Sequence, residues 1–103
     1  MSTLSLNSKE IRVLLLDPIP SAAKAAFQDI NFKIDECFEE QTEGSLLKMI
    51  GDYQIVCVSK ERDEVYLTED VLRSAHRLLA IGMFSRSTQQ VDLATAQTMG
   101  VSA

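Results

Sequence analysis

Apolar residues fall into four short runs along this chain, and a segment of helical character follows each run. The first, third and fourth runs are almost continuously apolar, whereas the second alternates between apolar and polar side chains. A strand in a parallel sheet is covered on both faces, so continuous short apolar runs are typical of central parallel strands. The sequence predicts strands at residues 11–16, 32–37, 54–58 and 79–83.

The segments between these runs carry apolar residues at helical spacing and start at residues that can cap a helix. The expected caps are Ser21, Thr42, Thr68 and Asp92. We expect Gly51 and Gly100 to end the second and fourth helices. The side chains predicted to be buried are Leu46, Leu47 and Ile50 in the second helix, Val71, Leu72, Ala75 and Leu78 in the third, and Leu93, Ala96 and Met99 in the fourth.

Strict alternation of strands and helices with short connections implies an α/β fold, in which a parallel sheet has helices on both faces. The flavodoxin-like strand order suits a sheet of about five strands. Residues 100–103 resemble the first residues of a further strand, so we expect a domain truncated at about its fifth strand. Residues 1–10 are rich in Ser, Thr and Asn and are expected to form a disordered lead-in, which leaves residues 11–103 as a partial domain.

Composition excludes several classes of protein. A net charge of −5 does not favour a broad nucleic-acid interface, and the longest apolar run, residues 13–16, is far too short to cross a bilayer. Cys37 and Cys57 lack C-x-x-C spacing, so both are expected to be reduced thiols, and His76 is expected to be a solvated residue near a helix end. With no signal-peptide pattern at the N-terminus, a cytoplasmic domain without metal ligands is predicted.

Ligands of parallel sheets bind beyond the carboxyl ends of the strands, so the loops after the predicted strands are the candidate sites. The loop at residues 59–66 carries Lys60 and Arg62, which could hold a carboxylate or a phosphate. The alternative is a solvated loop whose Lys and Arg pair with Glu61, Asp63 and Glu64. The loop at residues 17–20 is stiffened by two prolines and poor in donors, so it is a weaker candidate.

The turn at residues 84–90 carries hydroxyls, amides and one Arg just before a predicted helix, where anions are favoured. The alternative is an ordinary polar turn between a strand and a helix. The sequence contains no glycine-rich dinucleotide motif, no P-loop and no nucleophile elbow. A response-regulator receiver domain is excluded, because Ser59 stands where an Asp is needed and Asp17 has no acidic neighbour. No catalytic, cofactor-binding or metal-binding residue is assigned.

Four segments together resemble the D-isomer-specific 2-hydroxyacid dehydrogenases, and in particular their D-3-phosphoglycerate dehydrogenase branch. The segments are IRVLLL at residues 11–16, LTEDV at 67–71, LAIG at 79–82 and TQQVDL at 88–93. The resemblance implies the front part of the substrate-binding domain of an NAD-dependent oxidoreductase, which oxidises 3-phosphoglycerate in serine biosynthesis. The family's nucleotide-binding domain and its catalytic Arg, Glu and His come later in the chain. This chain alone is therefore expected to bind no NAD and to be inactive.

The family carries a basic run after its third strand that binds substrate. In one register Ser59 and Glu61 take the basic positions, and in a register shifted by one residue Lys60 and Arg62 do; both stay open. The turn after the fourth strand also departs from the family, because Ser85, Arg86, Ser87 and Gln89 replace its usual Cys, Ile, Gly and Asn. The predicted substrate-binding residues, expected to face one cleft and a small phosphorylated hydroxy acid, are Lys60, Arg62, Thr88 and Gln89.

Three hypotheses about function follow. The chain is a part of such a dehydrogenase, a stand-alone non-catalytic module that binds a small acid or associates with full-length subunits, or an α/β domain with a coincidental match. If the sheet stops near its fourth strand, that strand has an open edge. We therefore expect self-association through an edge that carries Leu79, Ala80, Ile81 and Met83.

Overall fold

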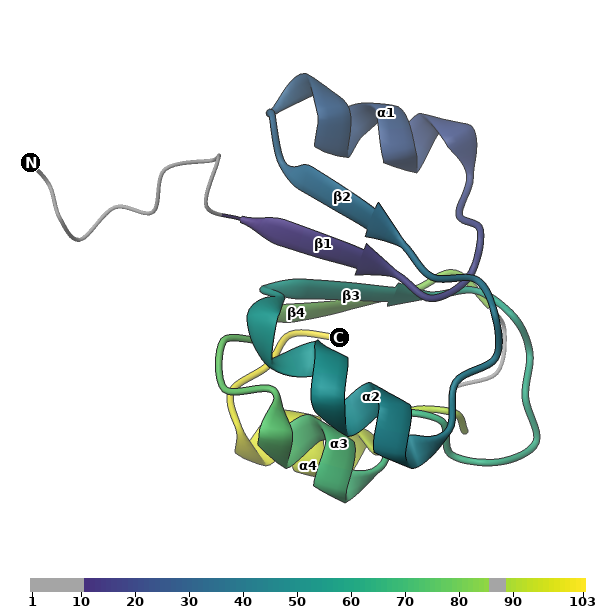
Figure 1. The fold of residues 1–103 in the computed structure, drawn as a ribbon, viewed down its shortest axis with the longest axis vertical. Helices are drawn as coiled ribbons and strands as arrows, with labels where there is room; N and C mark the ends of the chain where they lie inside the picture. Colours follow the sequence, from purple (N-terminus) through teal and green to yellow (C-terminus); the bar gives the residue numbers. More distant parts are fainter. Residues whose placement is uncertain (1–10, 86–88) are drawn as a thin grey trace, which may run out of the picture.

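The core of the fold is a sheet of four parallel strands (Figure 1). The computed structural model describes residues 11–85 and 89–103. The strands are β1 (Arg12–Leu15), β2 (Lys33–Glu36), β3 (Ile55–Val58) and β4 (Ala80–Met83), arranged in the order β2-β1-β3-β4. The predicted parallel α/β sheet of flavodoxin-like order is confirmed, and each strand lies within its predicted range.

The register of the sheet brings the strand ends level with one another. Leu15 of β1 lies opposite Glu36 of β2 on one side and Cys57 of β3 on the other, and Val58 lies opposite Met83 of β4. The loops that follow the strands therefore start from the same edge of the sheet. This edge is where a ligand site of a parallel sheet is expected.

Helices cover both faces of the sheet, but unequally (Figure 1). One face carries α1 (Ser21–Asp29), and the other carries α2 (Glu43–Met49), α3 (Glu69–Ser74) and α4 (Leu93–Thr98). A short 3₁₀ turn, η2 (Ile50–Asp52), extends α2. The prediction of helices on both faces is confirmed.

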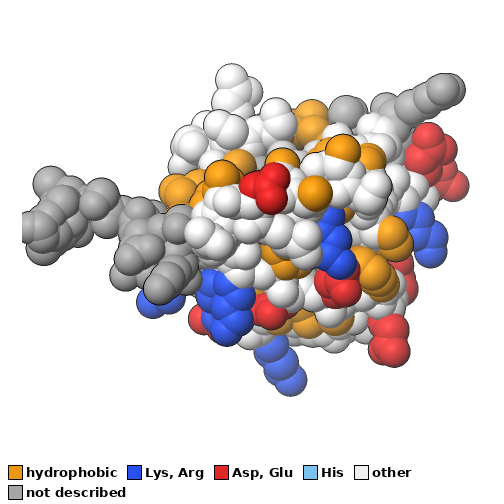
Figure 2. Space-filling view, turned by 90° about the horizontal axis from the view of Figure 1, so that it is seen from above, with side chains coloured by type: hydrophobic (Ala, Val, Ile, Leu, Met, Phe, Trp, Pro, Cys, Tyr) orange, Lys and Arg blue, Asp and Glu red, His pale blue; other side chains and the backbone are white. Residues whose placement is uncertain are grey.

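The unequal cover gives two cores of different size. The larger core lies under α2, α3 and α4 and is formed by side chains such as Leu14, Val56, Leu46, Leu72 and Ala96. The smaller core has Val13, Leu15 and Cys57 at its centre, and α1 contributes no fully buried residue to it. Figure 2 looks down on this face, and apolar side chains reach its surface in several places.

The helix caps match the sequence with two exceptions. Thr42, Thr68 and Asp92 each accept a hydrogen bond from a backbone N–H of the first helical turn. Ser21 was expected to cap α1, but it is the first helical residue, and the N-cap is Pro20, whose carbonyl accepts from Ala23 and Lys24. The fixed φ of proline suits this position, with φ −54° here, and no side chain caps the helix.

The second exception concerns glycine. Gly100 ends α4 at φ 77°, as predicted, because this left-handed conformation costs glycine little. Gly51 was predicted to end α2, but the helix ends at Met49 and Gly51 lies inside η2 without a positive φ. The chain tightens into a 3₁₀ turn here, which carries Ile50 into the core.

Two residues predicted to be buried are exposed. Leu47 and Leu93 each keep 38% of their surface exposed, although Leu46, Ile50 and Ala96 are buried as expected. Successive helical residues point about 100° apart, so Leu47 is turned away from the sheet that Leu46 faces. Leu78 is buried, but it lies beyond the end of α3 at Ser74.

The outer edge of β4 meets the end of the described chain. Ala80 and Ser102 form a parallel bridge, in which Ile81 N donates to Ser102 O (2.7 Å) and Ser102 N donates to Leu79 O (3.1 Å). The pairing has the direction and place expected of a fifth strand. Cys37 and Cys57 are free thiols. No helix within the described residues has the length and apolar character to span a bilayer.

Candidate functional site

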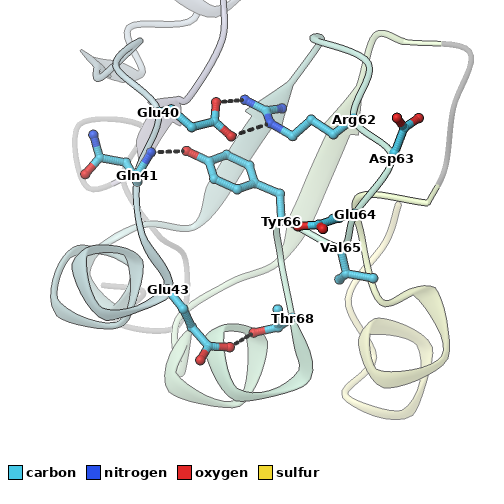
Figure 3. Close-up of a pocket in the computed structure, with 9 residues that line it drawn as sticks. All are labelled: Glu40, Gln41, Glu43, Arg62, Asp63, Glu64, Val65, Tyr66 and Thr68. Atoms are coloured by element: carbon cyan, nitrogen blue, oxygen red, sulfur yellow. Dashed lines mark hydrogen bonds and ion pairs between the residues drawn. The ribbon is translucent and has the colours of Figure 1, made fainter.

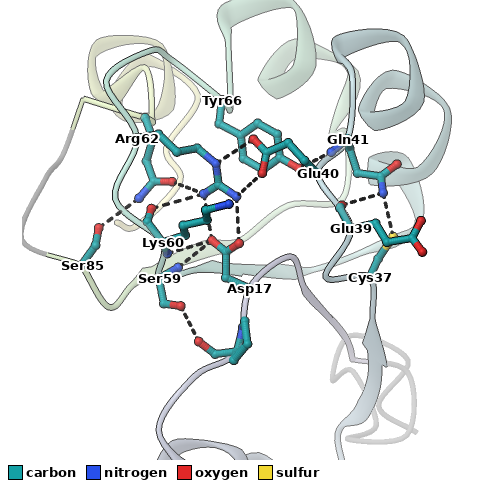
Figure 4. Close-up of polar contacts among 12 residues, drawn as sticks. Asp17, Cys37, Glu39, Glu40, Gln41, Ser59, Lys60, Arg62, Tyr66 and Ser85 are labelled. Atoms are coloured by element: carbon teal, nitrogen blue, oxygen red, sulfur yellow. Dashed lines mark hydrogen bonds and ion pairs between the residues drawn. The ribbon is translucent and has the colours of Figure 1, made fainter.

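Asp17 forms the floor of a polar site at the carboxyl edge of the sheet (Figure 4). It follows β1 after one intervening residue, Leu16, and only 2% of its surface is exposed. Its Oδ2 accepts from the backbone N–H of Ser59 (2.9 Å), the backbone N–H of Lys60 (3.0 Å) and Nη1 of Arg62 (2.8 Å). Its Oδ1 accepts from Nη2 of Arg62 (2.8 Å). Each oxygen of this buried carboxylate therefore accepts at least one hydrogen bond.

Arg62 stands at the centre of the site and has a second carboxylate, that of Glu40. Its Nε donates to Glu40 Oε2 and its Nη2 donates to Glu40 Oε1, both at 3.0 Å. Its Nη1 also donates to Gln90 Oε1 (2.6 Å), and its Cζ lies 3.9 Å from the centre of the Tyr66 ring. All five N–H groups of a guanidinium can be accounted for by these partners. Two bidentate ion pairs and a cation–π contact hold this side chain in one orientation.

This one guanidinium joins the loops that follow all four strands. Asp17 follows β1, Glu40 follows β2, Arg62 follows β3 and Gln90 follows β4. The loops after β3 and β4 are also joined through the backbone, since Tyr66 N and Leu67 N both donate to Gln90 O at 2.7 Å. The site lies between β1 and β3, where the strand order reverses and where ligands of such sheets bind.

The ion pairs shift the pKa values of the groups that form them. Burial alone would raise the pKa of Asp17, but hydrogen bonds from Arg62 and the N–H groups of Lys60 and Ser59 outweigh it and bring the pKa below its ordinary value. The hydrogen bond from Arg62 lowers the pKa of Glu40, and the hydrogen bond to Asp17 raises the pKa of Arg62. All three groups are therefore charged at neutral pH.

A pocket of about 520 Å³ opens beside Arg62 (Figure 3). Among the described residues, four carboxylates stand around it, whereas Arg62 is the single cationic residue in its lining and is already paired. One of the four, Glu43, accepts a hydrogen bond from Thr68 Oγ1 (2.6 Å). The pocket is therefore acidic. Its lining residues are Glu40, Gln41, Glu43, Arg62, Asp63, Glu64, Val65, Tyr66 and Thr68.

The predicted site residues are placed as follows. Lys60 is exposed and its backbone N–H binds Asp17, and Gln89 is exposed next to Gln90. Thr88 lies outside the described residues. Arg62 meets the turn after β4 through Gln90, but whether the four residues bind a substrate together stays a prediction. The alternative pairing of Arg62 with the acidic residues of its own loop is wrong, because its ion pairs are with Asp17 and Glu40.

Asp17 and Gln90 lie in loops that the sequence marked as candidates, at residues 17–20 and 84–90, but neither was predicted to belong to the site, and Glu40 was in no candidate loop. Asp17 carried a usable signal, since an acidic residue directly after a buried strand must find a cationic partner when it is buried. Glu40 stands in a segment without a hydrophobic pattern, and nothing in the sequence shows that Glu40 or Gln90 meets Arg62. Among the described residues, no three His, Cys, Asp or Glu side chains are grouped so that they could hold a metal ion.

These features define an α/β domain with a polar site at the switch point of its sheet. The family model of the D-isomer specific 2-hydroxyacid dehydrogenase catalytic domain matches residues 13–103, so the chain belongs to this family. Over 99 residues the chain is 34% identical to the D-3-phosphoglycerate dehydrogenase of Dictyostelium discoideum, covering 96% of this chain and 24% of that protein. The chain thus spans about a quarter of the length of this relative.

Solved structures support the same fold. The PH0520 protein of Pyrococcus horikoshii superposes with a TM-score of 0.73 at 22% identity, covering 88% of this chain and 26% of that one. The 3-phosphoglycerate dehydrogenase of Entamoeba histolytica, solved with NAD⁺ bound, gives a TM-score of 0.64 at 12% identity, covering 89% of this chain and 31% of that one. At these identities the likeness concerns the fold.

The turn after β1 does not fit the pyrophosphate of a dinucleotide. A dinucleotide-binding turn uses glycines so that backbone N–H groups can approach the pyrophosphate at a helix N-terminus. Here the turn between β1 and α1 contains Pro18 and Pro20, which have no N–H, and no glycine. The buried carboxylate of Asp17 would also repel phosphate at this turn.

Proposed function

We propose that this chain is the front part of the substrate-binding domain of an NAD-dependent D-3-phosphoglycerate dehydrogenase of serine biosynthesis, and that it acts in the cytoplasm. The names of the relatives support the substrate, and the family supports oxidoreductase chemistry. On its own the chain binds the substrate weakly and transfers no hydride, because hydride transfer needs a nicotinamide positioned against the substrate.

The substrate site that we propose is centred on Arg62, with Lys60 beside it and Gln89 after β4; Thr88, which lies outside the described residues, is included from its place in the sequence. The observation that carries this proposal is the position of Arg62 at the switch point, where its planar fork already holds two carboxylates. Carboxylate and phosphate are the two anionic groups of 3-phosphoglycerate. Asp17 acts as a positioning residue, because it fixes the plane of the guanidinium from below.

A second function is favoured by the outer edge of β4. Within the described residues this edge is paired at one point, the bridge between Ala80 and Ser102. An edge strand with free backbone groups is a template for another chain. We propose as the alternative a non-catalytic module that associates with itself or with full-length subunits.

Binding and turnover test the first proposal directly. The chain is titrated with 3-phosphoglycerate by NMR, and NAD reduction is followed in the same buffer. We expect saturable binding, with no NADH above background. Lys60→Met should weaken binding about tenfold if its charge meets the phosphate, and Lys48→Met, which removes an exposed charge from α2, should leave binding unchanged.

Arg62→Lys completes the series, since lysine keeps the charge but cannot form two bidentate pairs. Binding that survives both Lys60→Met and Arg62→Lys would show that the substrate site lies elsewhere. Turnover by the chain alone would show that it is more than a substrate-binding part.

A further inference from the structure

The two carboxylates on Arg62 differ sharply in their exposure. The Asp17 side chain is 3% exposed, whereas that of Glu40 is 53% exposed. Asp17 also accepts two backbone N–H groups, which hold it in place if Arg62 moves. Glu40 accepts hydrogen bonds from Arg62 and from no other described residue. One carboxylate is thus built into the fold, and the other is held by a single partner at the surface.

Glu40 covers the part of Arg62 that borders the pocket. Figure 3 shows the carboxylate of Glu40 and the Nε and Nη2 atoms of Arg62 facing each other beside the pocket, next to the ring of Tyr66. Asp17 occupies the other edge of the guanidinium, between Nη1 and Nη2. An anion that enters through the pocket can therefore reach Arg62 by taking the place of Glu40, and Asp17 need not move.

The backbone around Glu40 is anchored independently of its side chain. Gln41 N donates to the hydroxyl of Tyr66 (2.8 Å), and Gln41 Nε2 donates to Glu39 O (2.8 Å). The carboxylate of Glu40 can swing away while these contacts keep the loop in place. Because the Glu40 side chain is 53% exposed, its carboxylate regains water when it leaves Arg62, and the incoming anion takes over the ion pair with the guanidinium.

We propose that Glu40 is an internal stand-in for the substrate's anionic group, and that a carboxylate or phosphate of the substrate displaces it from the Nε/Nη2 edge of Arg62. This inference rests on the proposed substrate site. It makes Glu40 a residue that sets affinity: each binding event exchanges one ion pair for another, so substrates bind less tightly than they would to an open guanidinium. The neighbouring carboxylates of Asp63 and Glu64 add to this effect by repelling anions.

The test compares two neutral variants of adjacent residues. Glu40→Gln keeps the size of the side chain but removes the charge that competes for Arg62. Glu39→Gln removes the same charge one residue away, where the side chain points away from Arg62 (Figure 4). We expect Glu40→Gln to bind 3-phosphoglycerate about fivefold or more tightly than the original chain, and Glu39→Gln to change binding by less than about twofold.

A direct signal comes from the Nε–H resonance of Arg62 in the original chain. It should shift on titration with 3-phosphoglycerate, whereas the backbone N–H resonance of Ser59, which binds Asp17, should move little. This readout needs no variant, so it holds even if Glu40→Gln folds poorly. Inorganic phosphate and glycerate, titrated separately, show which anionic group makes the exchange.

The outcomes separate this inference from the proposed function. Binding that depends on Arg62 but is equal in the original chain and in Glu40→Gln overturns the inference and leaves the function standing. Binding by Glu40→Gln alone supports the inference, since Glu40 then blocks the site. If neither chain binds, both proposals are wrong. A gain in Glu40→Gln that persists when Arg62→Lys is added also overturns the inference.

Discussion

Asp17 and Arg62 form an ion pair in which each residue has further partners of its own. A buried carboxylate loses its hydration, and this cost is offset only when hydrogen bonds satisfy it. Here two backbone N–H groups and two guanidinium N–H groups meet the carboxylate of Asp17. The pair is therefore expected to hold the loops after β1 and β3 together.

Replacing Asp17 tests this role. We expect Asp17→Asn to lower the free energy of unfolding at pH 7 by about 2 kcal/mol, less than for a fully lost buried pair because Arg62 keeps Glu40. Asp63→Asn in the same loop is exposed and should change it by less than about 0.5 kcal/mol. Urea unfolding of the three proteins measures both effects.

The stabilising effect of Asp17 is expected to depend on pH. The pKa of Asp17 in the folded protein lies below its ordinary value of 3.8, so its stabilising effect is complete above that value and is lost as pH falls through the lower folded pKa. The difference in stability between the original chain and Asp17→Asn should therefore shrink below about pH 4. An equal difference at pH 7 and at pH 3 would contradict an electrostatic origin.

At the scale of elements, the sequence predicted the strands and helix starts that depend on local residue patterns. Strands β1, β3 and β4 and the caps at Thr42, Thr68 and Asp92 follow from local composition, because apolar runs and first-turn donors act over a few residues. The central contact of the site did not follow from it. Arg62 and Asp17 are 45 residues apart, and their meeting depends on the register of β1 and β3.

Gly82 in β4 shows how tightly the strands pack on the thinner side of the sheet. A Cβ at this position would lie 3.0 Å from the Sγ of buried Cys57 and 3.1 Å from the ring of Phe84. Cys57 cannot move far, but Phe84 is 41% exposed and can give way. Larger side chains at this point should therefore strain the smaller core without abolishing the fold.

We expect Gly82→Ala to lower the free energy of unfolding by about 1 kcal/mol. Gly44→Ala is the matched control, because Gly44 is exposed in α2 and a Cβ there would meet nothing closer than 3.9 Å. Alanine favours helix, so Gly44→Ala should be neutral or stabilising by up to about 1 kcal/mol. Thermal unfolding of both variants measures the effect. A Gly82→Ala protein as stable as the original chain would show that Cys57 and Phe84 leave room for a Cβ at this position.

At the scale of the whole molecule, the fold is asymmetric in two directions. In the described part of the chain, α2, α3 and α4 cover one face and α1 covers the other, and the sheet is bordered by β2 on one side and by β4 on the other. Beyond the bridge at Ser102, no described residue pairs with the outer edge of β4. Leu79, which is 53% exposed, stands at the start of this edge, where its carbonyl accepts from Ser102 N. An exposed apolar side chain at an edge that is paired at one point favours pairing with another chain farther along the strand.

We therefore expect this chain to self-associate as its concentration rises. Leu79→Lys should weaken self-association, because a charge beside an edge strand must be desolvated when a second strand pairs with that edge. Leu47→Lys is the control: Leu47 is 38% exposed on α2 and away from the edge. Sedimentation velocity over a wide range of concentrations should show a shift toward larger species for the original chain and for Leu47→Lys, but not for Leu79→Lys. A monomer at every concentration would contradict edge pairing. If both variants lose association equally, the interface is exposed apolar surface in general. A specific strand-to-strand contact would depend on the edge of β4 and would not involve Leu47.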